Sequence, residues 1–133
     1  MSETSGVLVV EDDDTIRKLL VEFLQSRAGT NVEMARDGVE ALHQISTNRF
    51  GVIVLDVMMP KMSGVDLLDS MMAMMSDPSL KSLGRPPAVV VVTAMSISAS
   101  ELEQRFPQLV RAVFRKPIDM LAFGECVKEH LHH

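Results

Sequence analysis

Three short apolar runs in this chain each end at an acidic or a hydroxyl side chain. The run 7–10 is followed by Glu11, the run 52–55 by Asp56, and the run 88–92 by Thr93. A carboxylate at the end of a buried strand is costly to desolvate, so stability alone does not account for it. In an open α/β sheet, ligands bind outside the carboxyl ends of the strands. We therefore expect the chemistry of this chain at one edge of a parallel sheet.

Strand-like and helix-like segments alternate from end to end. The continuous apolar run 6–10 predicts a strand that is covered on both faces, and further strands are expected at 31–35, 51–55, 88–92 and 112–114. A helix is expected after each strand, starting at the acidic cluster 11–14, Asp37, Gly64, Ser98 and Asp119. Five such units predict an α/β fold, a five-stranded parallel sheet with helices on both faces, because right-handed crossovers allow little else.

Local signals set the expected limits of two helices. In the first helix, Gly29 marks the end. Its predicted buried face, at helical spacing, comprises Ile16, Leu19, Leu20, Phe23 and Leu24. In the fourth helix, Ser98 and Glu101 have the spacing of a capping box, and Pro107 should stop the helix early. The Pro-, Gly- and Ser-rich stretch 76–87 predicts a surface loop.

Composition excludes several classes of protein. A chain of 133 residues with 47% hydrophobic residues suits one domain with its own core. A net charge of −5 argues against a nucleic-acid surface. Cys126 is the single cysteine, so an internal disulfide is impossible and a reducing compartment is expected. No apolar run approaches the ~20 residues of a membrane span, and the N-terminus lacks a signal peptide's basic region. We expect a cytoplasmic protein.

Taken together and in order, the polar residues at the strand ends resemble the receiver domain of two-component response regulators over essentially the whole chain. The matching residues are Glu11 and Asp12, Asp56 with Met59-Pro60 and Gly64, Thr93-Ala94, and Lys116-Pro117. The resemblance implies the flavodoxin-like fold of the CheY-like superfamily, with strand order 2-1-3-4-5. It also implies a single receiver domain over 1–133, with no output domain in this chain.

The acidic residues at the strand ends suggest a metal site. Carboxylates brought together repel one another and raise one another's pKa values, and a hard divalent cation with oxygen ligands removes the conflict. The resemblance implies that Asp12, Asp56 and the backbone carbonyl of Met58 bind Mg²⁺ directly, with Mn²⁺ able to substitute. Glu11 would act through a metal-bound water.

The resemblance also assigns a role to three side chains. Asp56 would accept a phosphoryl group from a histidine kinase or a histidine phosphotransfer protein. Thr93 and Lys116 would each contact a phosphoryl oxygen, as hydrogen-bond donor and point charge. The domain would catalyse only its own phosphorylation and dephosphorylation, and so is not expected to be a classical enzyme. It would signal to a downstream protein through its fourth helix, fifth strand and fifth helix, without nucleic acid or membrane.

Two other functions are compatible with parts of the sequence. A haloacid-dehalogenase-like phosphatase also forms an aspartyl phosphate, and Asp12-Asp13-Asp14 contains its D-x-D pattern after the first strand. A pseudo-receiver would be a protein-interaction module that has lost phosphorylation. Singly, the residues also have plain structural explanations: Asp13 and Asp14 as a helix cap, Thr93 as a strand former and Lys116 as a solvated loop lysine.

One position departs from the family pattern. Receiver domains usually carry an aromatic residue three positions before the lysine, where it swings inward to follow the threonine. Here that position is Val113, and Phe114 is its neighbour. Because side chains alternate along a strand, Phe114 should point to the opposite face. We therefore expect Val113 to face the Thr93 side and Phe114 to pack under a helix.

Overall fold

The computed structural model of the chain describes residues 6–58, 62–76, 86–94 and 99–131. In this part of the chain the strands are β1 (Gly6–Val10), β2 (Val32–Ala35), β3 (Phe50–Asp56), β4 (Ala88–Thr93) and β5 (Val110–Arg115). The helices are α1 (Asp14–Ala28), α2 (Gly38–Thr47), α3 (Gly64–Met75), α4 (Ala99–Arg105) and α5 (Met120–Leu131). Strand and helix alternate as the sequence predicts.

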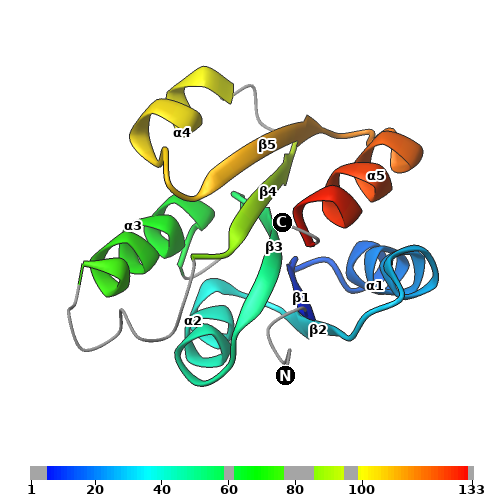
Figure 1. Cartoon of the computed structure of the whole chain (residues 1–133), viewed down its shortest axis with the longest axis horizontal. Coiled ribbons are helices and arrows are strands. Elements are labelled where there is room, and N and C mark those ends of the chain that lie inside the picture. The colour runs from blue at the N-terminus through cyan, green and yellow to red at the C-terminus, as the bar shows by residue number, and fades with distance from the viewer. Residues whose placement is uncertain (1–5, 59–61, 77–85, 95–98, 132–133) are drawn as a thin grey trace.

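The strands form one sheet in the order β2-β1-β3-β4-β5, and every neighbouring pair is parallel. Helices cover both faces of this sheet (Figure 1). The predicted fold class and strand order are therefore confirmed. In this order β1, β3 and β4 are neighbours, so their carboxyl ends meet at the same edge.

Two apolar clusters lie on opposite faces of the sheet, because side chains alternate along each strand. Leu8 and Ile53 face the cluster under α2, α3 and α4. Val7 and Val54 face the cluster under α1 and α5, where Phe123 is fully buried. The central strands are thus covered on both sides, which is why they are continuous apolar runs.

The predicted signals at several helix ends are confirmed. Gly29 follows α1 in the left-handed conformation with φ 63°, which glycine adopts without a steric cost. The Asp119 carboxylate accepts a hydrogen bond from the Ala122 amide, as expected of a residue that caps α5. The helix α4 ends at Arg105, two residues before Pro107. The predicted start at Ser98 and most of the predicted 76–87 loop lie outside the described residues.

Two predictions on local structure are wrong. Leu19, expected on the buried face of α1, is 58% exposed, and Arg17 is buried with Leu20, Val21 and Leu24 instead. A charged residue such as Arg17 is normally expected in solvent, so the predicted buried face was centred on apolar residues alone. This shifted the predicted face around the helix toward Leu19. The strand β5 also starts two residues earlier than predicted, since Val110 pairs with Val89 and packs in the core.

Candidate functional site

The carboxyl ends of β1 and β3 bring the predicted acidic residues together. Glu11 follows β1, Asp12 comes next, and Asp56 ends β3. Carboxylate oxygens of these three residues all lie within 4.8 Å of one another. Glu11 and Asp56 are only 1% and 4% exposed, whereas Asp12 is exposed to solvent. Three carboxylates around one point, open to solvent on one side, form the donor set that a hard divalent cation prefers.

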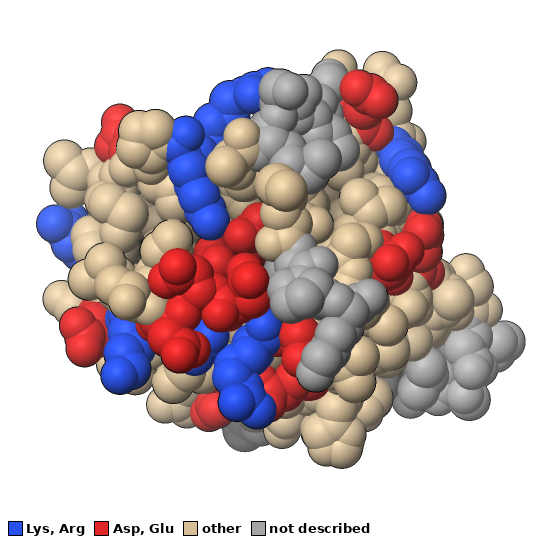
Figure 2. All heavy atoms as spheres, turned by 180° about the vertical axis from the view of Figure 1, so that it is seen from behind, with Lys and Arg blue, Asp and Glu red and all other residues tan. Residues whose placement is uncertain are grey.

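Figure 2 shows the face turned away from the viewer in Figure 1, with acidic side chains gathered near its centre and basic side chains beside them. The Lys116 ammonium group is within contact distance of both buried carboxylates. Lys116 Nζ lies 3.1 Å from Glu11 Oε1 and 3.1 Å from Asp56 Oδ2. Lys116 follows β5, and its amide donates a 2.9 Å hydrogen bond to the Thr93 carbonyl at the end of β4. The lysine is therefore held at the same edge as the acids, and is not a free loop lysine.

The cluster shifts the proton affinity of two of its members. Burial raises the pKa of Glu11, and the nearby Asp56 charge raises it further, although the Asp13 amide and Lys116 oppose both effects. Burial by itself would lower the pKa of Lys116, but its hydrogen bonds to Glu11 and Asp56, together with their negative charges, outweigh burial and raise it. Lys116 therefore stays protonated at neutral pH and offsets part of the negative charge of the site.

The loop after β3 orients Asp56. The amide of Met58 donates a 2.9 Å hydrogen bond to Asp56 Oδ1, while Lys116 takes the other carboxylate oxygen. Gly64 begins α3 directly against this loop, and its amide bonds to the Val57 carbonyl. A Cβ at Gly64 would lie 2.4 Å from Val57 Cα, so only glycine allows this approach. The Met59-Pro60 part of the family motif lies outside the described residues.

Thr93 and its neighbours on β5 lie where the sequence predicts. Thr93 is fully buried at the end of β4. Val113 packs against the cluster under α2, α3 and α4, while Phe114 packs on the other face of the sheet. The Phe114 ring stands edge-on to Phe123 of α5, with centroids 5.8 Å apart. The predicted orientation of Val113 and Phe114 is thus confirmed.

The acidic residues after Asp12 serve the start of α1. Asp13 is the N-cap, and its Oδ1 accepts a 2.9 Å hydrogen bond from the Ile16 amide. The Asp14 carboxylate pairs with the Arg17 guanidinium, which lowers the pKa of Asp14. Arg17 also donates a 2.9 Å hydrogen bond to the Glu11 carbonyl. Arg17 is the residue beside the site that sequence analysis missed, and an arginine six positions after a strand-end acid is the only signal it offers.

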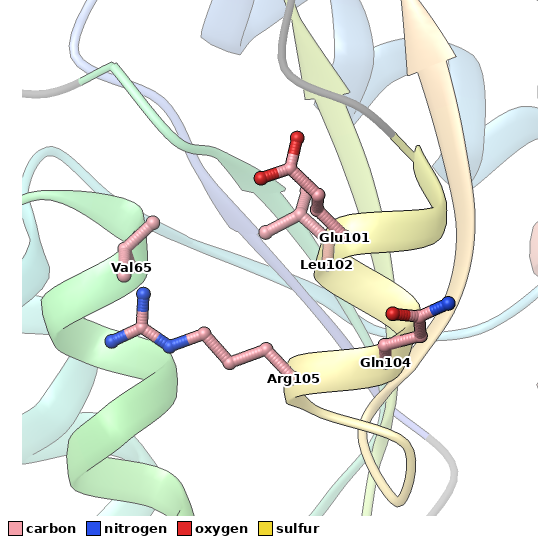
Figure 3. Close-up of a pocket in the computed structure, with 5 residues that line it drawn as sticks. All are labelled: Val65, Glu101, Leu102, Gln104 and Arg105. Atoms are coloured by element: carbon pink, nitrogen blue, oxygen red, sulfur yellow. The ribbon is translucent and has the colours of Figure 1, made fainter.

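A hollow lies between α3 and α4, away from the acidic cluster (Figure 3). Its volume is about 360 Å³, and it is lined by Val65, Glu101, Leu102, Gln104 and Arg105. Arg105 Nη2 lies 3.2 Å from Asp69 Oδ2 of α3, and both side chains are exposed. The hollow shares no residue with the acidic cluster at the strand ends.

No helix in the described ranges is both long and apolar enough to cross a membrane.

The chain was compared with known families and proteins. A family model described as "Response regulator receiver domain" matches residues 7–123. The chain is 52% identical over 56 residues to the response regulator MprA of Mycobacterium sp. (strain KMS), which covers 42% of this chain and 24% of that protein. The same protein of Mycobacterium tuberculosis (strain ATCC 25177 / H37Ra) is 50% identical over 56 residues. The match thus spans about a quarter of the length of these curated relatives.

Two solved structures share the whole architecture. The chemotaxis protein CheY4 of Vibrio cholerae has a TM-score of 0.73 and 27% identity, covering 93% of this chain and 96% of that chain. The response regulator protein TrrA of Thermotoga maritima, solved in complex with Mg²⁺-BeF, has a TM-score of 0.75 and 26% identity. That match covers 94% of this chain and 97% of the other.

Proposed function

This chain belongs to the response regulator receiver domain family, and on that premise we propose that Asp56 accepts a phosphoryl group from a phosphohistidine. One observation carries the proposal. The Asp56 carboxylate lies at a strand end, within 4.8 Å of two other carboxylates and 3.1 Å from Lys116. That arrangement combines a nucleophile, a set of cation ligands and a positive charge.

A divalent cation fits the donor set of the site. Glu11, Asp12 and Asp56 offer only oxygen atoms, which favours Mg²⁺, with Mn²⁺ able to substitute. We propose that Asp12, Asp56 and the Met58 carbonyl hold the ion and that Glu11 acts through a water. When bound, Mg²⁺ would neutralise the carboxylates and polarise a phosphoryl oxygen. The Mg²⁺-BeF complex of the Thermotoga protein supports this choice of ion.

In the proposed transfer, an Asp56 carboxylate oxygen bonds to phosphorus as the phosphorus–nitrogen bond of the phosphohistidine breaks. The electron pair of that bond stays with the imidazole, which takes up a proton, and Asp56 becomes an acyl phosphate. Lys116 would pair with one phosphoryl oxygen, and the Thr93 hydroxyl would donate to another. The residues therefore act by orientation and charge, and the domain is proposed not to be a classical enzyme.

The partners follow from this chemistry. A histidine kinase or histidine phosphotransfer protein would donate the phosphoryl group, and a downstream protein would bind the α4–β5–α5 surface. The proposed location is the cytoplasm, with no direct contact to nucleic acid or membrane. A phosphatase that uses Asp12 as nucleophile is disfavoured, because Asp14 of its D-x-D pattern is held by Arg17.

Asp56 is tested by Mg²⁺-dependent labelling with acetyl phosphate, measured as intact mass and mapped by fragmentation. We expect one phosphoryl group on the wild type and on Asp13→Asn, a variant that keeps a good helix cap. Asp56→Asn should take up none. Full labelling of Asp56→Asn, or a label at Asp12, would contradict the proposal and favour the phosphatase alternative.

The conformational response should involve Val113 and little ring movement. Phe114 packs against Phe123 on the far face of the sheet, so its ring is not placed to follow Thr93. Phosphorylation should instead repack Val113 around Thr93 and shift the start of α4. Met95 and Ser98, which we expect to take part, lie outside the described residues. A valine offers fewer differential contacts than an aromatic ring, so a partner should complete the shift. A beryllofluoride-bound structure with Phe114 rotated toward Thr93 would contradict this.

A further inference from the structure

Arg17 is a buried cation next to the acidic cluster. It is 6% exposed and occupies an inward-facing position of α1, beside Leu20 and Leu24. Its Nε is buried and has no hydrogen-bond partner in the described part of the chain. Removing a guanidinium from water is costly, and an apolar side chain of similar volume often packs there at no loss. Stability of the helix does not explain an arginine at this position.

The two partners of Arg17 lie at the two ends of one short turn. Nη1 donates a 2.9 Å hydrogen bond to the backbone carbonyl of Glu11, and Nη2 pairs with the carboxylate of Asp14. The residues between these contacts are Asp12 and Asp13. The Asp13 amide in turn bonds to Glu11 Oε2 at 3.2 Å. Arg17 therefore clamps the backbone that carries two of the three clustered carboxylates.

The contact with the Glu11 carbonyl bears directly on Asp12. A peptide bond is planar, so fixing the Glu11 carbonyl also fixes the amide of Asp12 and limits where its side chain can point. Asp12 is the exposed member of the cluster and is the one free to turn away from Glu11 and Asp56. Mutual repulsion of the carboxylates favours such a turn whenever the cation is absent.

We propose that Arg17 is a positioning residue for the divalent cation site, holding the Glu11–Asp14 turn so that Asp12 converges with Asp56. The inference rests on the proposed function, because it takes Mg²⁺ as the ligand of the acidic cluster. Groups that orient metal ligands from outside the coordination sphere commonly affect metal affinity or activity about 10- to 100-fold. Without Arg17, cation binding must order the turn as well as bind the ion, and its affinity falls.

The test is calorimetric titration of the full chain with Mg²⁺, together with the rate of acetyl phosphate labelling as a function of Mg²⁺. Arg17→Met should raise the Mg²⁺ dissociation constant about 10-fold. Arg17→Lys, which keeps one charged donor, should fall between this variant and the wild type. At saturating Mg²⁺ the labelling rates should agree within about twofold, because Arg17 does not touch the reacting atoms. A folded Arg17→Met with unchanged Mg²⁺ affinity would overturn the proposal.

A second pair of variants keeps the test valid if Arg17→Met does not fold. Asp14→Asn removes one end of the clamp, whereas Asp13→Asn removes the same charge one position away and leaves the clamp intact. Asp14→Asn should weaken Mg²⁺ binding at least about threefold more than Asp13→Asn. Equal dissociation constants for these two variants would overturn the proposal.

The wild-type titration separates this inference from the proposed function. If the wild type and every variant fail to bind Mg²⁺, the proposed cation site itself is wrong. If the wild type binds Mg²⁺ and is labelled at Asp56 while the Arg17 and Asp14 variants match their controls, only the positioning role is wrong.

Discussion

Lys116 at the strand ends and Arg105 at the α3–α4 hollow each connect separate elements of the fold through carboxylates. The distances are almost the same, 3.1 Å from Lys116 Nζ to each of its two partners and 3.2 Å from Arg105 Nη2 to Asp69. The surroundings differ. The Lys116 side chain is 22% exposed and its partners are nearly buried, whereas the Arg105 side chain is 58% exposed.

Since the distances are nearly equal, we expect burial to decide how much each ion pair contributes to stability. Exposed pairs contribute about 0–1 kcal/mol, because water screens the attraction and two flexible side chains must be ordered. Removing one partner of a buried pair costs roughly 3–5 kcal/mol, since it leaves a charge without compensation. The strand-end cluster should therefore respond strongly to substitution, and the α3–α4 pair weakly.

Asp12→Ala should produce the largest effect, on cation binding. Asp12 is the solvent-exposed member of the cluster, so its removal takes away a ligand without leaving a buried charge unpaired. We expect the Mg²⁺ dissociation constant to rise about 100-fold, equivalent to about 2.7 kcal/mol. The metal-free protein should keep its stability or gain some from relieved repulsion. Titration calorimetry and urea unfolding in a chelator check both parts, and unchanged Mg²⁺ affinity would show that Asp12 is not a ligand of the cation.

Lys116→Met should produce the largest loss of stability without metal. Glu11 and Asp56 would then face each other without a cation, and we expect a loss of about 2 kcal/mol at pH 7, discounted for the partial exposure of Lys116. Added Mg²⁺ should recover part of this loss. The variant should still be phosphorylated, because Lys116 is not the nucleophile, but most spectral changes around Thr93 should disappear. Urea unfolding measures the stability, and amide spectra measure the response.

The raised pKa of Glu11 gives a smaller effect that depends on pH. Burial raises this pKa above the ordinary value of 4.5, so the folded metal-free protein binds more protons at Glu11 than the unfolded chain does. The Glu11 contribution to stability is therefore favourable at low pH and is lost as pH rises through the folded pKa. A glutamine does not titrate, so the Glu11→Gln variant lacks this pH-dependent contribution and serves as the reference. The unfolding free energy of the wild type relative to Glu11→Gln should thus increase as pH falls from 7 toward the ordinary pKa of 4.5, and a difference that stays flat would contradict the assigned cause.

Arg105→Gln should have the smallest effect. Its pair with Asp69 is exposed on both sides, so we expect a loss of at most about 0.5 kcal/mol, further reduced by salt. Urea unfolding of Arg105→Gln beside Lys116→Met tests the comparison directly. Similar losses in the two variants would show that burial does not separate the two pairs.

Much of this arrangement was predictable from sequence. Apolar runs identified β1, β3 and β4, because strands covered on both faces carry few polar residues. The edge strands β2 and β5 contain charged residues and were expected from the alternation of strand-like and helix-like segments. Gly29 and Asp119 marked helix ends through local backbone chemistry, which depends only on nearby residues. The gathering of Glu11, Asp12 and Asp56 followed from parallel strands, whose carboxyl ends share one edge.

The sequence by itself determined the five strand–helix units, the edge where the polar residues gather and the opposite directions of Val113 and Phe114. Only the tertiary structure decided that Arg17 lies inward and Leu19 outward, and that Lys116 joins Glu11 and Asp56. The physical reason is the range of the interactions involved. Helical periodicity fixes how side chains are spaced around a helix, but not which side of the helix faces the core. The partners of Lys116 lie 105 and 60 positions away along the chain, so local sequence does not reveal them.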